Sequence, residues 1–417
     1  MKIIFYENSN VQNLQPISLA RPSFDILCGG TTLYKLLQQE LKPVKINFLV
    51  RDYLMKTAVQ KFKSVKANNP KILFLDGSIV PSVKIINEIK KINKSVLLKS
   101  KTQIVGAYLD LTEIDLKNKD ITKLKQPEVV GFLIKLKLPV KKVNWPLFEY
   151  PWDVISYNEE ILPINLKHFS KNFKQLKPNV FVGKNVTIEG KPFIDNTKGI
   201  IIIDDNSVIE EMSVLRGPLY IGKNCQIVSF TSLNGSSSIG DVTKLGGEVV
   251  NVTVQGYSNK VHTGVIADSY IGEWVNIGGG TSFSDLKNTY SKVKMLGKDT
   301  GRQYLGAIVG DYTKTAIGTM VYTGKVIGVN CLLYGTITSD VPSFTNAGTM
   351  LKKWVECPLA VAQKTQSKVM PRRKIKMTGT DKKLMEKVFQ ITGPDRQQAK
   401  VKKVSPRGEA GKPEFIK

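Results

Sequence analysis

The chain has 417 residues and a formal net charge of +26, from 61 basic and 35 acidic residues. This length allows two or three domains, and no apolar run reaches the length of a membrane-spanning helix, so we expect no membrane-spanning segment. A positive field of this size favours polyanionic partners such as nucleotides, coenzyme A or nucleic acid. A lysine-rich, solvated surface is the alternative interpretation.

The four cysteines are widely scattered and lack the spacing of metal ligands: Cys28, Cys225, Cys331 and Cys357. This pattern predicts buried, reduced thiols in a cytoplasmic protein. The opening run, Met1 to Asn8, is too short for a signal peptide and predicts a first strand.

Short apolar runs alternate with helical patterns over residues 1–165. The runs at 46–50, 71–77 and 95–100 read as strands, and Leu33–Leu41 and Tyr53–Phe62 read as helices. This alternation predicts an α/β, Rossmann-like domain with a largely parallel sheet.

A helix is expected from Trp152 to Phe173, joining this domain to the next. It carries His168, for which the sequence offers no partner, so we interpret this histidine as structural.

Aliphatic residues recur every six positions in the second region, residues 166–345. Neither a helix nor a strand has this period. A chain that turns a corner every six residues places one aliphatic side chain per face inside a three-faced coil, so the period predicts a left-handed parallel β-helix of hexapeptide repeats. The recurring residues are Val182, Ile188, Ile194, Ile200, Ile203, Ile209, Leu215, Ile221, Ile227, Leu233, Ile239 and Leu245, and then Val265, Ile271 and Ile277.

Two segments interrupt the period, Leu245–Val265 and Phe283–Leu305. Insertions in a solenoid gather on one face and often form a binding site. The first insertion contains Lys260 and His262, one of only two histidines in the chain.

The last region, residues 346–417, is a basic tail. Lys352–Lys417 holds 18 basic and 6 acidic residues, a composition that could contact nucleic acid. Thr380–Thr392 predicts one amphipathic helix with Thr380 as its N-cap. From Gly393 onward the chain is too polar to bury itself, and we expect disorder.

The stretch around His262 combines the parts that acyl transfer requires. An imidazole can take the proton of an amine or hydroxyl acceptor near pH 7. Asp268 could orient that ring, and Asn276 or the backbone N–H groups of Gly278–Gly280 could stabilise the oxyanion on the thioester carbonyl.

This stretch resembles a known family closely. His262, Asp268, Ile271-Gly272 and the run Val275–Thr281 match, without a gap, the active-site coils of the bifunctional glucosamine-1-phosphate acetyltransferase/N-acetylglucosamine-1-phosphate uridylyltransferase family. The family makes UDP-N-acetylglucosamine. The resemblance implies a homotrimer, acetyl-coenzyme A as co-substrate, His262 as base and Asn276 as a contact of the acceptor sugar.

The same resemblance suggests further candidate residues. For the sugar substrate these are Glu248, Lys244, Lys260, Tyr257 and Asn288. For acetyl-coenzyme A they are Gly279, Gly280, Thr281 and Thr319.

Two positions depart from the family pattern. Val265 stands where the family has a tyrosine, and Val250 stands where it has a phosphate-binding lysine, for which Lys244 or Lys260 could substitute. A divergent branch, which joins a shortened nucleotidyltransferase domain to the same solenoid, looks closer still.

The N-terminal region resembles the nucleotidyltransferase domain of that family through Leu14-x-Pro16, Arg21-Pro22 and Gly29-Gly30. Arg21, Gly30 and Asp76 are the implied nucleotide-binding residues, and Asp76 could hold Mg²⁺. The glycine-rich phosphate loop is replaced by Glu7-Asn8-Ser9-Asn10, and the phosphate-binding lysine by Ser23. We therefore expect a domain that binds a nucleotide or nucleotide sugar and does not catalyse its transfer.

Two other functions compete with this one. Subunits of the translation-initiation guanine-nucleotide exchange factor join a degenerate nucleotidyltransferase-like domain to the same solenoid, so a regulatory, RNA-binding protein stays open. A zinc carbonic anhydrase needs three histidines on neighbouring faces, and His168 and His262 are the only two in the chain, which excludes it.

Overall fold

The structure, a computed structural model, describes residues 1–62, 69–114, 121, 124–404 and 413–416. The chain forms two compact units. The first contains residues 1–26 and 31–150, and the second contains residues 27–30 and 151–417. Among the described helices, none is long and apolar enough to cross a lipid bilayer.

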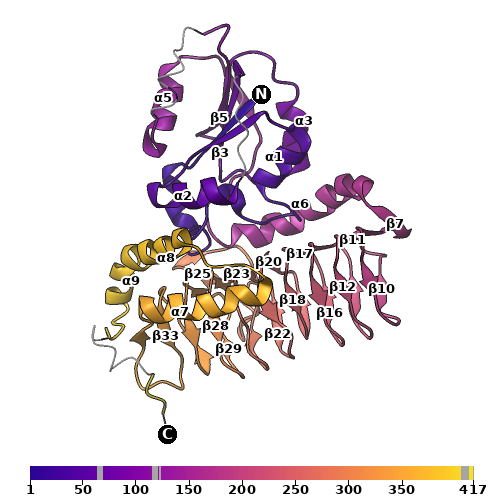
Figure 1. Cartoon of the computed structure of the whole chain (residues 1–417), viewed down its shortest axis with the longest axis vertical. Helices are drawn as coiled ribbons and strands as arrows, with labels where there is room; N and C mark the ends of the chain where they lie inside the picture. The colour runs from indigo at the N-terminus through magenta and orange to yellow at the C-terminus, as the bar shows by residue number, and fades with distance from the viewer. Residues whose placement is uncertain (63–68, 115–120, 122–123, 405–412, 417) are drawn as a thin grey trace. The chain divides into compact units, whose positions relative to one another are not determined.

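The first unit is a six-stranded mixed sheet with helices, in the strand order β2-β1-β3-β5-β4-β6 (Figure 1). The strands are β1 (Lys2–Tyr6), β2 (Lys45–Leu49), β3 (Lys71–Asp76), β4 (Val96–Ser100), β5 (Gln103–Asp110) and β6 (Val140–Val143). The helices are α1 (Leu33–Leu41), α2 (Asp52–Lys61), α3 (Val83–Ile89) and α5 (Val129–Lys135).

The predicted α/β class is confirmed, and two strands were missed, β5 and β6. β5 runs antiparallel to both of its neighbours, β3 and β4, so the sheet is mixed where a largely parallel one was expected. The reason is a tight connection: β4 ends at Ser100 and β5 begins at Gln103, and two intervening residues permit only a hairpin.

The second unit begins with α6 (Asp153–Phe169), which lies against one face of the solenoid at β14, β17 and β20. His168, on this helix, is half-buried with its ring edge against Phe169.

The solenoid has three faces of parallel strands, as the hexapeptide period predicts. The first face holds β8 (Val180–Val182), β11 (Ile201–Ile203), β14 (Leu219–Ile221), β17 (Ser237–Ile239), β20 (Thr253–Gly256), β23 (Tyr270–Glu273), β27 (Ile308–Val309) and β30 (Val326–Ile327), with β7 (Lys174–Lys177) antiparallel at its edge. The second face holds β9 (Thr187–Ile188), β12 (Val208–Ile209), β15 (Gln226–Ile227), β18 (Lys244–Leu245), β21 (Asn259–Lys260), β28 (Lys314–Thr315), β31 (Leu332–Leu333) and β33 (Thr345–Ala347). The third face holds β10 (Phe193–Asp195), β13 (Val214–Arg216), β16 (Ser232–Asn234), β19 (Glu248–Val250), β22 (Val265–Ala267), β24 (Ser282–Phe283), β29 (Met320–Val321) and β32 (Thr336–Ile337).

The core of the solenoid is a set of aliphatic ladders, one per face. The eight predicted positions from Ile203 to Leu245 are all buried in one cluster. Val265 is a correction: Ile266 pairs with Val249 and points inward, whereas Val265 is half-buried. The shift follows from the first insertion, which changes the step between inward residues.

The tail is folded where the structure describes it. It contains the strand β34 (Val355–Glu356) and the helices α7 (Leu359–Val369), α8 (Gly379–Ile391) and α9 (Gly393–Gln398). Thr378, and not Thr380, caps α8. The expected disorder from Gly393 is wrong for residues 393–404; residues 405–412 lie outside the described residues.

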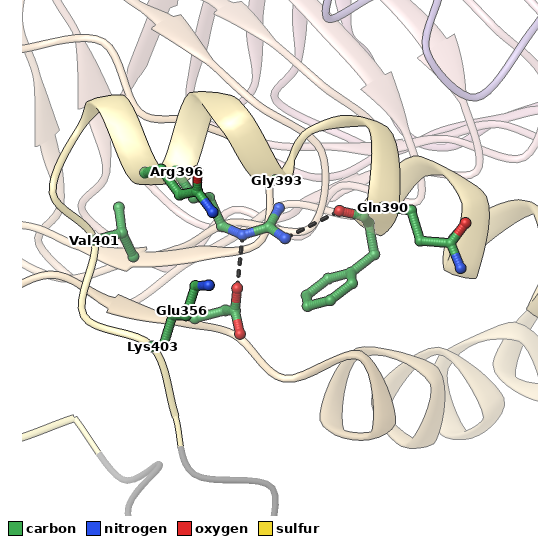
Figure 2. A pocket seen from close by; sticks show the side chains of 8 residues that line it. Glu356, Gln390, Gly393, Arg396, Val401 and Lys403 are labelled. Carbon is green, nitrogen blue, oxygen red and sulfur yellow. Dashed lines mark hydrogen bonds and ion pairs between the residues drawn. The ribbon is translucent and has the colours of Figure 1, made fainter.

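The arginine of the last helix explains this order. Arg396 is buried and its guanidinium reaches Glu356 at 2.8 Å, the hydroxyl of Thr392 at 2.9 Å and the carbonyl of Phe389 at 2.9 Å. Figure 2 shows this cluster beside a cavity of about 310 Å³. The guanidinium N–H groups of Arg396 are already engaged by the protein. We therefore interpret this cluster as a structural lock, meaning a set of contacts that holds the tail against the end of the solenoid.

Replacing this arginine should loosen the tail. Arg396→Met leaves the Glu356 carboxylate without its guanidinium, and breaking a buried ion pair costs roughly 3–5 kcal/mol. We expect a lower Tm and faster limited proteolysis within residues 355–404. Lys383→Met, at an exposed position on α8, is the control, and equal proteolysis of the two variants would contradict the lock.

Candidate functional site

His262 lies at the corner between the second and third faces, after β21 and before β22. Its side chain is exposed. Gly279 of the following coil lies beside it: a Cβ built there would lie 3.4 Å from Cβ and 3.6 Å from Cγ of His262. The structure therefore places an exposed histidine against the glycine run.

The coils are stacked at this corner by backbone hydrogen bonds. The N–H of Gly280 donates to the carbonyl of Thr263 at 2.9 Å, and the N–H of Gly318 donates to that of Gly279 at 2.8 Å. Within the described residues, the N–H groups of Thr263 and Gly279 donate to no protein acceptor. Both are free to bind a ligand oxygen.

Asn276 lies on the second face, three residues before Gly279. It joins β21 to β28 through single bridges to Asn259 and Lys314. Its Oδ1 accepts a hydrogen bond from Nδ2 of Asn259 at 3.1 Å, and the side chain is half-buried. Arg373 of the tail donates to Oδ1 of Asn259 at 3.4 Å, so the tail reaches this row of amides.

Asp268 does not contact His262. It lies at the next corner, between the third and first faces, and forms an ion pair at 3.0 Å with Arg302 of the second insertion. The same guanidinium binds Glu159 of α6 at 2.6 Å. Burial, together with the neighbouring carboxylate of Asp285, raises the pKa of Asp268 to about 7. Asp268 therefore anchors the insertion.

Lys260 is also placed differently from a substrate contact. It is buried, with 2% exposure, and occupies an inward position of the second face between Leu245 and Ile277. Its Nζ donates to backbone carbonyls only. We therefore leave it out of the substrate-binding set.

The remaining candidates divide by exposure. Glu248 and Asn288 are exposed, and Lys244 is half-buried. Tyr257 stacks on Trp274 with ring centroids 4.6 Å apart. Thr281 and Thr319 are fully buried, and their hydroxyls bond the carbonyl of Ala316 inside the coil. The two threonines therefore support the corner from within and do not face a ligand.

Sequence reasoning missed Asn259, Lys314 and Arg302. Asn259 and Lys314 were hidden because the step between coils is irregular here, so no period places them beside Asn276. Arg302 belongs to the second insertion, among exposed polar residues. The sequence there does not indicate that this arginine forms an ion pair.

In the first unit, a carboxylate occupies the position after β1. Glu7 is buried, accepts the N–H of Ser23 at 3.0 Å, and accepts the backbone N–H and the Nε of Arg51, each at 3.0 Å. A guanidinium and backbone N–H groups are the donors that bind phosphate oxygens elsewhere. Here they are engaged by the protein's own carboxylate.

Asp76 ends β3 and does not fit a Mg²⁺ site. It is fully buried, its Oδ1 accepts from the N–H and hydroxyl of Ser78, and its Oδ2 accepts from Asn8. Burial raises its pKa to about 6. Among the described residues, no group of three His, Cys, Asp or Glu could hold a metal ion.

The other two nucleotide-binding candidates belong to different units. Arg21 is buried beside Asp25, at 3.4 Å. Gly30 belongs to the second unit, where its N–H donates to Ser238 and a Cβ would lie 3.1 Å from the ring of Tyr220.

Residues 3–173 match the family model described as sugar nucleotidyl transferase. A bifunctional sugar-1-phosphate nucleotidylyltransferase/acetyltransferase of Sulfurisphaera tokodaii is 27% identical over 65% of this chain and 66% of its own length. The bifunctional protein GlmU of Synechococcus elongatus is 28% identical over 40% of this chain and 34% of its own length.

The chain is a distant homologue of these bifunctional proteins. Its residues 3–173 are similar to sugar nucleotidyl transferases, and its second unit contains a β-helix of hexapeptide repeats. Its matched part spans 66% or less of the length of these two homologues. Among solved structures, a UDP-N-acetylglucosamine acyltransferase of Francisella novicida is similar over 53% of this chain and 87% of that one, at 14% identity and a TM-score of 0.25.

The buried carboxyl of Asp268 predicts a pH dependence, because burial outweighs the opposing effect of Arg302 on its pKa. The unfolded chain holds the Asp268 proton only below about pH 3.9, whereas the folded chain holds it to about 7. The folded state therefore binds more protons in this window, and its stability falls as the pH rises from 4 to 7.

Asp268→Asn should remove this contribution, which is on the order of 1–3 kcal/mol. Melting both proteins at pH 5 and pH 7.5 tests it: the Tm of the parent relative to the variant should be lower at pH 7.5. Asp299→Asn, on the exposed surface of the same insertion, is the control. A difference that does not depend on pH would refute the assignment.

Proposed function

We propose that the second unit transfers an acetyl group from acetyl-coenzyme A to the amine of an amino-sugar phosphate resembling glucosamine 1-phosphate. The observation that supports it is the exposed imidazole of His262 against the backbone of Gly279. The name of the Sulfurisphaera tokodaii homologue includes an acetyltransferase activity, which is consistent with acetyl-coenzyme A as the donor.

In this mechanism the amine nitrogen of the sugar attacks the thioester carbonyl carbon. His262 takes a proton from that amine as the new bond forms. Negative charge develops on the carbonyl oxygen, and the N–H of Gly279 binds it. The carbonyl reforms as the thiolate of coenzyme A leaves. The proton on His262 then returns to the thiolate or to solvent.

The acceptor is held beside this corner. Asn276 offers an amide to the sugar hydroxyls, and Glu248, Lys244 and Asn288 are its other candidate contacts, since none of the three is buried. Gly280 keeps the corner narrow for the thioester. An exposed catalytic corner favours completion of the groove by a second copy of the chain, so we propose a homotrimer.

For the first unit we propose binding of a nucleotide or nucleotide sugar without turnover. Glu7 occupies the donors of Ser23 and Arg51, and the carboxylate of Asp76 is engaged by Ser78 and Asn8. Neither arrangement provides the charge neutralisation that a transferring phosphoryl group needs. Ligand binding of this kind also fits a regulatory, nucleotide-sugar-sensing protein.

His262→Ala tests the base. It should lower kcat for acetyl transfer to glucosamine 1-phosphate by a factor on the order of 10² to 10⁴, measured by release of free thiol. His168→Ala, on α6, is the matched control and should transfer at the parent rate. If the His262 variant does so as well, another group is the base.

Pyrophosphate release from UTP with a panel of sugar 1-phosphates and Mg²⁺ tests the first unit. We expect no turnover, while nucleotide sugars raise the Tm because a ligand that binds the folded state stabilises it. Robust turnover would show that the Glu7–Arg51 arrangement does not close the site.

A further inference from the structure

The aliphatic ladder of the second face is interrupted by one cation. Lys260 stands in register with Leu245 of the preceding coil, and its side chain is 2% exposed. Glycine at 247 leaves the space for it, because a Cβ there would lie 2.7 Å from Nζ. A buried ammonium is costly unless it is fully hydrogen-bonded, so its partners show what it does.

The three partners all belong to the corner that carries His262. Nζ donates to the carbonyl of Gly246 at 2.6 Å, of His262 at 3.1 Å and of Gly264 at 2.9 Å. An ammonium has three N–H groups, so each carbonyl receives one. The ammonium group of Lys260 therefore connects the backbone at His262 and Gly264 to the backbone at Gly246 of the preceding coil.

The direction of one peptide follows from this contact. Because the carbonyl of His262 points inward to Nζ, the N–H of the same trans peptide, that of Thr263, points away from the interior. Thr263 is exposed, and its N–H donates to no described acceptor. This donor and the exposed imidazole thus share the outer side of the corner.

We propose that Lys260 is a positioning residue whose buried ammonium fixes the peptides on either side of Thr263, holding the His262 imidazole and the Thr263 N–H ready for one substrate. The N–H of Thr263 is a second backbone donor for a substrate oxygen beside the base. This inference rests on the proposed acyl transfer at His262.

Burial also lowers the pKa of Lys260 to about 8. Near neutral pH the side chain still carries all three protons that the three carbonyls require.

Lys260→Met tests the proposal, because it keeps the length and removes all three donors. A misplacement of about 1 Å costs roughly 10²-fold in rate, so we expect kcat for acetyl transfer to fall by about that factor with little change in KM. Lys260→Arg, which keeps a cation with donors, should restore part of kcat. Ile227→Met, at an inward position of the same face two coils before Lys260, is the matched control and should retain the parent kcat.

A second measurement does not depend on activity. The chain has only two histidines, so the ring signals of His168 and His262 can be resolved by NMR and assigned with His262→Ala. Lys260→Met should move or broaden the His262 signal and leave that of His168. Ile227→Met should leave both in place.

The outcomes separate the two proposals. If the parent protein shows no acetyl transfer, the proposed function is refuted. In that case the NMR ring signal of His262 alone decides whether Lys260 positions this histidine. With an active parent, a folded Lys260→Met variant that keeps kcat, or that keeps the His262 signal, overturns the positioning role. If Lys260→Met lacks a cooperative melting transition, Lys260→Gln, which retains one amide donor group, replaces it under the same criteria.

Discussion

Everything in the second unit depends on the register between one coil and the next. Parallel pairing sets Leu215 on Leu233 and Ile227 on Leu245, so each aliphatic side chain is buried by the same position of the neighbouring coil. Burying one such side chain contributes roughly 1.5–3 kcal/mol. A ladder fixed in this way leaves the corners free to carry other residues, and the proposed acyl transfer uses one of these corners.

The period of six predicted the ladders because burial imposes it at every coil. It failed where an insertion changed the step: Val265 was expected inside and Ile266 is there instead. The matched motif holds His262 and Gly279 in one continuous segment, and the structure brings them together at one corner. It did not predict that Asp268 pairs with Arg302, because that contact joins segments 34 residues apart and depends on how the second insertion folds.

Contacts that are distant in sequence or directed inward also explain the errors at Lys260 and in the tail. A lysine in a basic protein suggests a surface contact, and only the three inward carbonyls reveal its place. The tail looked too polar to fold because Arg396 counts as solvated in any composition argument, although the structure buries it against Glu356. In both cases backbone or side-chain partners far along the sequence decide the outcome, and local pattern contains no information about them.

The two ends of the solenoid have a further consequence. A stack of parallel coils would present bare strand edges at its first and last turns, and such edges recruit further strands. Here β7 pairs antiparallel with β8 at one end, and β34 pairs antiparallel with β33 at the other. At each end the reversed strand covers one of the three faces, so a parallel coil of another molecule cannot continue the repeat on that face.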